Sequence, residues 1–117
     1  MKIAFTAKGE NWDAMVDPRF GRCEYIVLYD EEKDELTAYD NTLTTEVAHG
    51  AGPKTAQIVF DLNADVIITG NGPGEKAYEV LKEGSVEIFV GAANKTLKEA
   101  YEDYKNGKLL KFGGETE

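Results

Sequence analysis

The sequence predicts an α/β fold in which a mixed β-sheet lies between two layers of helices. Three short segments rich in β-branched and aromatic residues come first, over about residues 2–40, with no helical pattern between them. From about residue 50 the chain alternates helical and strand patterns instead. This βββαβαβα order is typical of a three-layer α/β/α sandwich, here with about five strands.

The first three strands are predicted from short apolar runs. "KIAFTA" (2–7) has the composition of a buried strand, and "EYIVLYD" (24–30) has strand length. The acidic "EEKDE" (31–35) reads as a turn, and "LTAYD" (36–40) alternates apolar and polar residues as an edge strand does. The second and third strands are therefore expected to form a hairpin.

The second half of the sequence predicts two helix–strand units and a last helix. Helical spacing of apolar residues over 52–63 and 72–84 is followed by apolar strands at 65–70 and 86–91. The last helix has a Thr96-x-x-Glu99 capping box and is expected to end at Gly107. The remaining "KLLKFGGETE" is expected to be a short segment and a tail.

Length and charge limit the possible classes of protein. A chain of 117 residues, 42% of them hydrophobic, fits one domain, which we expect over residues 1–112 with a flexible tail at 113–117. No apolar run approaches the roughly 18 residues of a membrane span, and no signal peptide is evident, so we expect a cytoplasmic protein without a membrane partner. A formal net charge of −9 argues against nucleic-acid binding.

The predicted connectivity brings several loops to one edge of the sheet. The second strand runs antiparallel to the first, and right-handed crossovers keep the fourth and fifth strands parallel to it. Loops 8–23 and 41–52 and the turns 70–73 and 91–95 then emerge at the carboxyl edge, where ligands bind in open α/β folds.

Two turns at this edge are near copies, "GAGPK" (50–54) and "GNGPG" (70–74). Each places proline at the expected first helical position with glycines before it, so that backbone N–H groups and a positive helix end could receive an anion. The alternative is that these residues only connect a loop to a helix. The candidate binding residues are Gly50, Gly52, Gly70 and Gly72.

The chain's one cysteine and one histidine, Cys23 and His49, both fall in loops at this edge. Thiolate and imidazole are ligands that iron, copper and zinc prefer, so both residues are candidate metal and cofactor ligands. Arg19 and Arg22 precede the cysteine, and their charge is expected to lower the pKa of the thiol and to add to an anion site.

Other interpretations of these loop residues stay open. A lone cysteine is often a small buried hydrophobe, and a lone histidine a capping residue. A nucleophilic pair of the two lacks an evident third group to orient the histidine. Asp13 and Asp17 are interpreted as solvated charges, and Trp12 and Phe20 as anchors of the loop on the domain.

Four stretches of the sequence carry a family resemblance: "DPRFGRCEYIVLYD", "HGAGPKTAQ", "ITGNGPGEKAYEVLKEGSVEIFVG" and "TLKEAYEDYKNGKL". Together they resemble the dinitrogenase iron-molybdenum cofactor biosynthesis family, whose small domains are related to NifX, to the carboxyl-terminal part of NifB and to NafY. The resemblance runs from the first strand to about Leu109.

The resemblance implies a ribonuclease H-like fold with sheet order 3-2-1-4-5 and an antiparallel second strand. It also implies non-catalytic carriage of an iron-sulfur cluster, the iron-molybdenum cofactor or a precursor, between donor and acceptor proteins. Cys23 and His49 would then hold the cofactor. A homodimer that contributes one cysteine from each chain is left open.

Two further function classes are considered. The first is a regulatory module that binds a small organic or nucleotide-like anion through the helix N-termini and the arginines. The second is a thiol-based or metal-dependent enzyme. A nuclease of the ribonuclease H type would need acidic metal ligands on the first strand, and "KIAFTA" has none.

Overall fold

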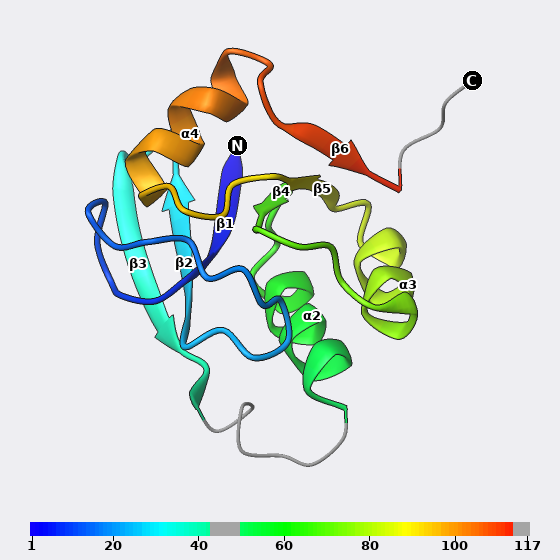
Figure 1. The fold of residues 1–117 in the computed structure, drawn as a ribbon. Helices are drawn as coiled ribbons and strands as arrows, with labels where there is room; N and C mark the ends of the chain where they lie inside the picture. The colour runs from blue at the N-terminus through cyan, green and yellow to red at the C-terminus, as the bar shows by residue number, and fades with distance from the viewer. Residues whose placement is uncertain (43–49, 114–117) are drawn as a thin grey trace.

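The computed structural model describes residues 1–42 and 50–113, and within them the predicted order of strands and helices is confirmed through the last helix (Figure 1). The elements are β1 (Lys2–Ala7), β2 (Tyr25–Asp30), β3 (Glu35–Asp40), α2 (Ala51–Asp61), β4 (Val66–Ile68), α3 (Glu75–Glu83), β5 (Glu87–Val90), α4 (Leu97–Lys105) and β6 (Leu110–Phe112). None of these helices is long and apolar enough to cross a membrane.

The strands form one mixed sheet with the order β3-β2-β1-β4-β5-β6. β1 pairs antiparallel with β2 and parallel with β4, and β4 pairs parallel with β5. The predicted antiparallel second strand and the predicted order 3-2-1-4-5 are therefore confirmed for the first five strands. The carboxyl ends of β1, β4 and β5 lie at one edge, as parallel pairing requires.

The predicted number of strands, five, is wrong, because a sixth strand adds to the edge of the sheet. β6 pairs antiparallel with β5, with Phe112 opposite Ile88. Phe112 packs edge-to-face against Tyr78 of α3 at 5.8 Å, and the Tyr78 hydroxyl donates to Gly113 O at 3.0 Å. Three residues are too few to show a strand period, so these contacts with α3 and β5 decide the strand. Beyond Gly113, the tail predicted at 113–117 lies outside the described residues.

The alternation of side chains in β1 shows how the sheet separates two apolar cores. Ile3 and Phe5 belong to a buried cluster on the face covered by α4, whereas Ala4 belongs to a cluster on the face covered by α2 and α3. Figure 1 shows α4 apart from α2 and α3. The three-layer arrangement is thus built from the period of two along each buried strand.

The predicted capping box of α4 and the predicted residues after α2 and α4 are confirmed. Thr96 and Glu99 form the predicted capping box of α4. Asn63, after α2, and Gly107, after α4, both have the left-handed backbone expected just past a helix, with φ of 60° and 72°.

Candidate functional site

The loop between β1 and β2, residues 8–24, brings the predicted edge segments together (Figure 1). The Asp17 N–H donates to Thr6 O at the end of β1 at 2.8 Å. The Asn71 N–H, in the turn after β4, donates to Pro18 O at 3.0 Å. The predicted meeting of loops 8–23 and 70–73 at the carboxyl edge is therefore confirmed.

The same loop lies directly on the start of α2. A Cβ added to Gly21 would be 2.8 Å from both Cα and N of Gly52, so these two backbones touch with no room for a side chain. The Thr55 hydroxyl, one turn into α2, donates to Gly21 O at 3.2 Å. The Arg19–Arg22 segment is therefore held between the start of α2 and the turn after β4.

Close packing within the chain explains why two of the four candidate binding residues are glycines. A Cβ on Gly70 would lie 2.6 Å from Pro18 Cα, and one on Gly72 would collide with the ring of Phe112. Gly50 instead has a left-handed backbone, with φ of 81°, at the N-cap of α2. In the turn "GNGPG", Gly70 and Gly72 thus contact the chain's own residues on the side where they lack a side chain.

The two helix starts differ, and the predicted position of the prolines is wrong at both. Pro53 is the third residue of α2, and Pro73 precedes Gly74, the N-cap of α3. The first turn of α2 contains no acidic residue, and no described side chain caps it, whereas α3 carries Glu75 in its first turn. A carboxylate there opposes an incoming anion, so α2 offers the better anion site.

Asp17 is fully buried, and its interpretation as a solvated charge is wrong. Its carboxylate accepts hydrogen bonds from the backbone N–H of Arg19 at 3.0 Å, from Nε at 3.2 Å and from Nη2 at 3.3 Å. These bonds and the charge of Asp17 raise the pKa of Arg19, which stays protonated. An aspartate that accepts from the N–H two residues ahead is a known turn pattern, so "DPR" contained a signal for this contact.

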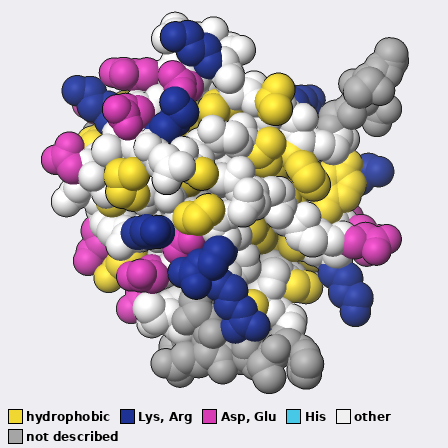
Figure 2. Space-filling view, viewed as in Figure 1, with side chains coloured by type: hydrophobic (Ala, Val, Ile, Leu, Met, Phe, Trp, Pro, Cys, Tyr) yellow, Lys and Arg dark blue, Asp and Glu magenta, His cyan; other side chains and the backbone are white. Residues whose placement is uncertain are grey.

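Two arginines lie on the part of this loop that contacts α2. Arg19 is exposed and Arg22 is half-buried. Figure 2 shows Lys and Arg side chains over the loop between β1 and β2, with Asp and Glu side chains beside them. An anion approaching the start of α2 from this side therefore meets positive charge, although the whole chain has a net charge of −9.

Cys23 lies behind the loop rather than on its surface. Its side chain is fully buried in the core under α2 and α3. Burial, followed by the nearby charge of Asp17, raises the pKa of the thiol to about 12. The expected lowering is therefore wrong: the loss of water on burial raises the pKa of the thiol, and Asp17 both adds to this rise and pairs with Arg19.

The backbone and thiol of Cys23 belong to a buried polar network that the sequence did not reveal. Asn41 Nδ2 donates to Cys23 O at 3.0 Å and to the Thr55 hydroxyl at 3.1 Å, and it lies 3.5 Å from Cys23 Sγ. Asn41 Oδ1 is buried, and no described residue donates a hydrogen bond to it. The network connects the end of β3, the end of the long loop and α2.

Of the two predicted metal ligands, only Cys23 lies among the described residues. His49 lies outside the described residues, and Cys23 faces the core. Within residues 1–42 and 50–113, no group of three His, Cys, Asp or Glu side chains is placed to hold a metal ion. For this part of the chain, the edge offers hydrogen-bond donors and positive charge rather than a preformed ligand set.

The predicted anchors of the loop are confirmed. Trp12 packs edge-on against Phe5 at 6.0 Å, on the α4 face, and Phe20 is 4% exposed in the core on the other face. The loop is thereby attached to both faces of the sheet. This attachment limits the positions that Arg19 and Arg22 can take.

Three solved structures are similar to this chain over nearly its whole length. The chain is 30% identical to the apo form of the orange protein from Desulfovibrio gigas, with a TM-score of 0.90 over 99% of this chain and 96% of that one. It is also 30% identical to a Thermotoga protein described as a candidate NifB protein of the DUF35 family, with a TM-score of 0.82 over 99% and 97% of the two chains. PH0822, at 21% identity and a TM-score of 0.72 over 97% of each chain, shares the fold.

Among curated proteins, none matches the chain in sequence. The family model described as dinitrogenase iron-molybdenum cofactor matches residues 1–107, which include every element from β1 to α4. The resemblance seen in the sequence is thus confirmed, and this chain belongs to the dinitrogenase iron-molybdenum cofactor family.

Proposed function

We propose that this protein carries an anionic iron-sulfur or iron-molybdenum-type cofactor, or a precursor of one, at the carboxyl edge of its sheet. It would receive the cofactor from one cytoplasmic protein and release it to another, without catalysing a reaction. The family supports the class of cargo. The observation that carries the proposal is the contact of the Arg19–Arg22 segment with the start of α2, a helix whose first turn has no acidic residue.

The geometry of Arg19 suits an anionic cargo. A guanidinium has five N–H groups, and Asp17 takes one edge of it through Nε and Nη2. The remaining N–H groups belong to a side chain that is 57% exposed, so they can donate to a sulfide or oxygen of the cargo. Arg22 and the amides at Gly50–Gly52 complete the proposed set of donors.

Few direct bonds are needed for such a carrier. A preassembled cluster contains its own bridging sulfides, so one or two protein ligands and several N–H donors suffice and also permit release. Cys23 and His49 remain the proposed metal ligands. Binding by Cys23 would require the loop to move off α2 and the thiol to lose its proton, because the folded thiol is buried and its pKa is raised.

The test is an anaerobic titration of the purified protein with iron and sulfide, followed by visible absorbance and bound iron. We compare the wild type with Arg19→Gln and Arg22→Gln, with Cys23→Ser and His49→Ala, and with Lys33→Gln as a control in the exposed turn after β2. We expect uptake in the wild type and the control and a clear loss in the arginine variants. Equal or negligible uptake in all proteins would overturn the proposal.

The cysteine and histidine variants then separate two modes of carriage. Loss of uptake in Cys23→Ser or His49→Ala would indicate coordination by those residues. Normal uptake in both, with loss in the arginine variants, would indicate that hydrogen bonds and charge hold the cofactor.

The burial of Cys23 favours one second candidate function, a module that binds a small organic anion through Arg19, Arg22 and the start of α2. Such a module needs no thiol. We then expect small organic anions to raise the melting temperature equally in the wild type and in Cys23→Ser. A thermal-shift titration at constant ionic strength tests it, and the absence of stabilisation would exclude the anions used.

A further inference from the structure

A cavity lies on the α4 face of the sheet, apart from the arginine segment. It is open, has a volume of about 460 Å³, and lies between the start of the long loop, β2, the turn after β2 and α4. Three aromatic side chains form its apolar part, those of Trp12, Tyr29 and Tyr101. Its volume is in the range of small-molecule sites.

The three rings form one mutually packed group. Ring centroids are 4.9 Å apart for Trp12 and Tyr29, 5.4 Å for Tyr29 and Tyr101, and 5.7 Å for Trp12 and Tyr101. All three side chains are half-buried, so part of each ring remains accessible from the cavity. Rings held in this way present their surface without a further loss of side-chain freedom on binding.

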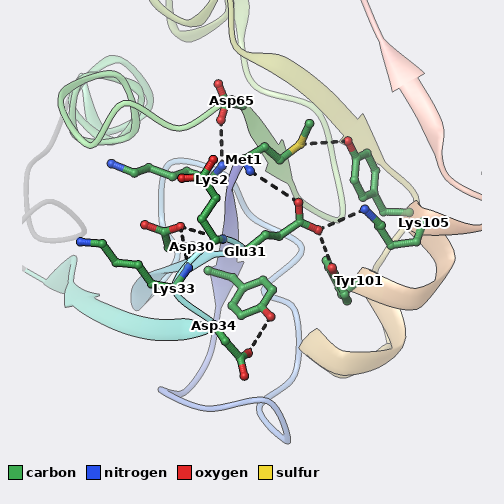
Figure 3. A network of polar contacts seen from close by, with 12 residues as sticks. Met1, Lys2, Asp30, Glu31, Lys33, Asp34, Asp65, Tyr101 and Lys105 are labelled. Carbon is green, nitrogen blue, oxygen red and sulfur yellow. Dashed lines mark hydrogen bonds and ion pairs between the residues drawn. The ribbon is translucent and has the colours of Figure 1, made fainter.

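Both tyrosine hydroxyls are fixed by carboxylates, as Figure 3 shows for Tyr101 and Glu31. The Tyr29 hydroxyl donates to Asp34 Oδ1 at 2.7 Å, and the Tyr101 hydroxyl donates to Glu31 Oε2 at 2.5 Å. These bonds raise the pKa of both phenols, together with burial, which is the larger cause for Tyr101. The rings therefore stay neutral, and their orientation is set.

The polar part of the cavity is mainly negative. Three carboxylates line it, those of Asp13, Asp34 and Glu102, against one ammonium group, that of Lys98. Within the described part of the chain, none of these three carboxylates forms an ion pair. The aromatic surface is thus bordered by a net negative charge, because three carboxylates and one ammonium group line the cavity.

We propose that this cavity binds a small organic ammonium cation, of the size of choline, on the aromatic surface and between the carboxylates. The faces of aromatic rings attract cations, and quaternary ammonium groups are favoured because they lose little hydration. The border of carboxylates selects a cation over a neutral molecule and repels an anion.

The neighbouring contacts show the same chemistry within the chain. The Lys105 ammonium lies 5.9 Å from the centroid of the Tyr101 ring and 3.1 Å from Glu31 Oε2. An ammonium group on this helix is therefore already held by a ring and a carboxylate together. The cavity repeats this combination with Trp12, Tyr29 and the carboxylates around them.

The single tryptophan of the chain, Trp12, makes the proposal directly measurable. We titrate the protein with choline chloride and follow tryptophan fluorescence, with sodium chloride adjusted to keep the ionic strength constant. The matched probe is 3,3-dimethyl-1-butanol, which has the shape of choline without its charge. We expect a saturable change with choline and none at equal concentrations of the alcohol.

Variants then test the role of the charges. Replacing both Asp13→Asn and Glu102→Gln, which keeps shape and removes two exposed charges, should weaken choline binding about tenfold or more. Glu83→Gln, at the exposed end of α3, is the control and should bind as the wild type does. The same response to the alcohol, the same affinity in the double variant, or no saturable change with choline would each overturn the proposal. None of these readouts depends on cofactor carriage.

Discussion

The buried carboxylate of Asp17 holds the exposed guanidinium of Arg19: their side chains are 0% and 57% exposed, and they are 3.2 Å apart at Oδ1 and Nε. The inner residue thus orients the outer one, at the point where the long loop meets the carboxyl edge. Because a buried carboxylate needs compensation of its charge, the position of Arg19 is coupled to the stability of the loop.

We expect Asp17→Asn to destabilise the protein and to weaken cofactor uptake. The amide cannot accept charge-assisted hydrogen bonds from Nε, Nη2 and the backbone N–H together, and Arg19 then loses its fixed orientation. The expected loss is about 1–2 kcal/mol in the free energy of unfolding, at the low end for a charged hydrogen bond because Arg19 is exposed. Urea unfolding measures it, with Asp13→Asn, exposed in the same loop, as the control. Equal midpoints for the two variants would contradict the role given to Asp17.

Gly21→Ala should separate the loop from α2. The added methyl group would lie 2.8 Å from two backbone atoms of Gly52, and backbone cannot move aside as a flexible side chain can. We expect a loss of about 1–3 kcal/mol. Gly74→Ala is the comparison, because its φ of −70° suits alanine and its Cβ would meet nothing within 4 Å, so it loses only the smaller preference of the N-cap of α3 for glycine over alanine. Thermal unfolding compares the two, and a loss as large in Gly74→Ala would disprove the steric explanation.

The thiol of Cys23 should react slowly in the folded protein. A pKa near 12 in place of 9.0 reduces the thiolate fraction at pH 8 on the order of a thousandfold, and burial slows access further. The rate with an aromatic disulfide reagent is measured for the native chain and for the chain in urea. Native and unfolded rates within tenfold of each other would show that the loop opens readily.

Stability at high pH should also depend on this thiol. Below about pH 9 the thiol is protonated in both states, and its burial contributes fully to stability. Between pH 9 and about pH 12 the unfolded chain loses the proton and the folded chain keeps it, so the free energy of unfolding falls as pH rises.

The comparison is urea unfolding from pH 8 to pH 11 for the wild type and Cys23→Ala. Tyrosines whose pKa values are also raised, such as Tyr101, titrate in both proteins, so the difference between the two curves isolates the thiol. Parallel curves would show that the pKa of Cys23 is not raised.

Phe112→Ala should loosen the sixth strand. Phe112 contacts Tyr78 and Gly72, so we expect a loss of about 2 kcal/mol, less than for a fully buried phenylalanine. Leu110→Ala in the same strand is the control, because Leu110 is 72% exposed and its truncation removes little contact. If both variants unfold at the same urea concentration, packing on α3 does not hold β6.

The elements whose signals are local could be predicted from the sequence. The apolar run of β1, the spacing of apolar residues in α2 and α3, and the capping box at Thr96 depend only on residues close along the chain. The handedness of crossovers extends these signals to the order of the first five strands. For the same reason, the meeting of the long loop with the turn after β4 could be predicted without coordinates.

Tertiary contacts decided the rest. Leu110–Phe112 is a strand because β5 and α3 receive it, and Asp17 and Cys23 are buried because the long loop folds back onto α2. The same packing decides the electrostatics, since the pKa of a thiol follows from the water it loses and the charges around it rather than from its neighbours in sequence. Residue types at the edge therefore indicated the chemistry available there, whereas the packing of one loop determined which groups face the solvent.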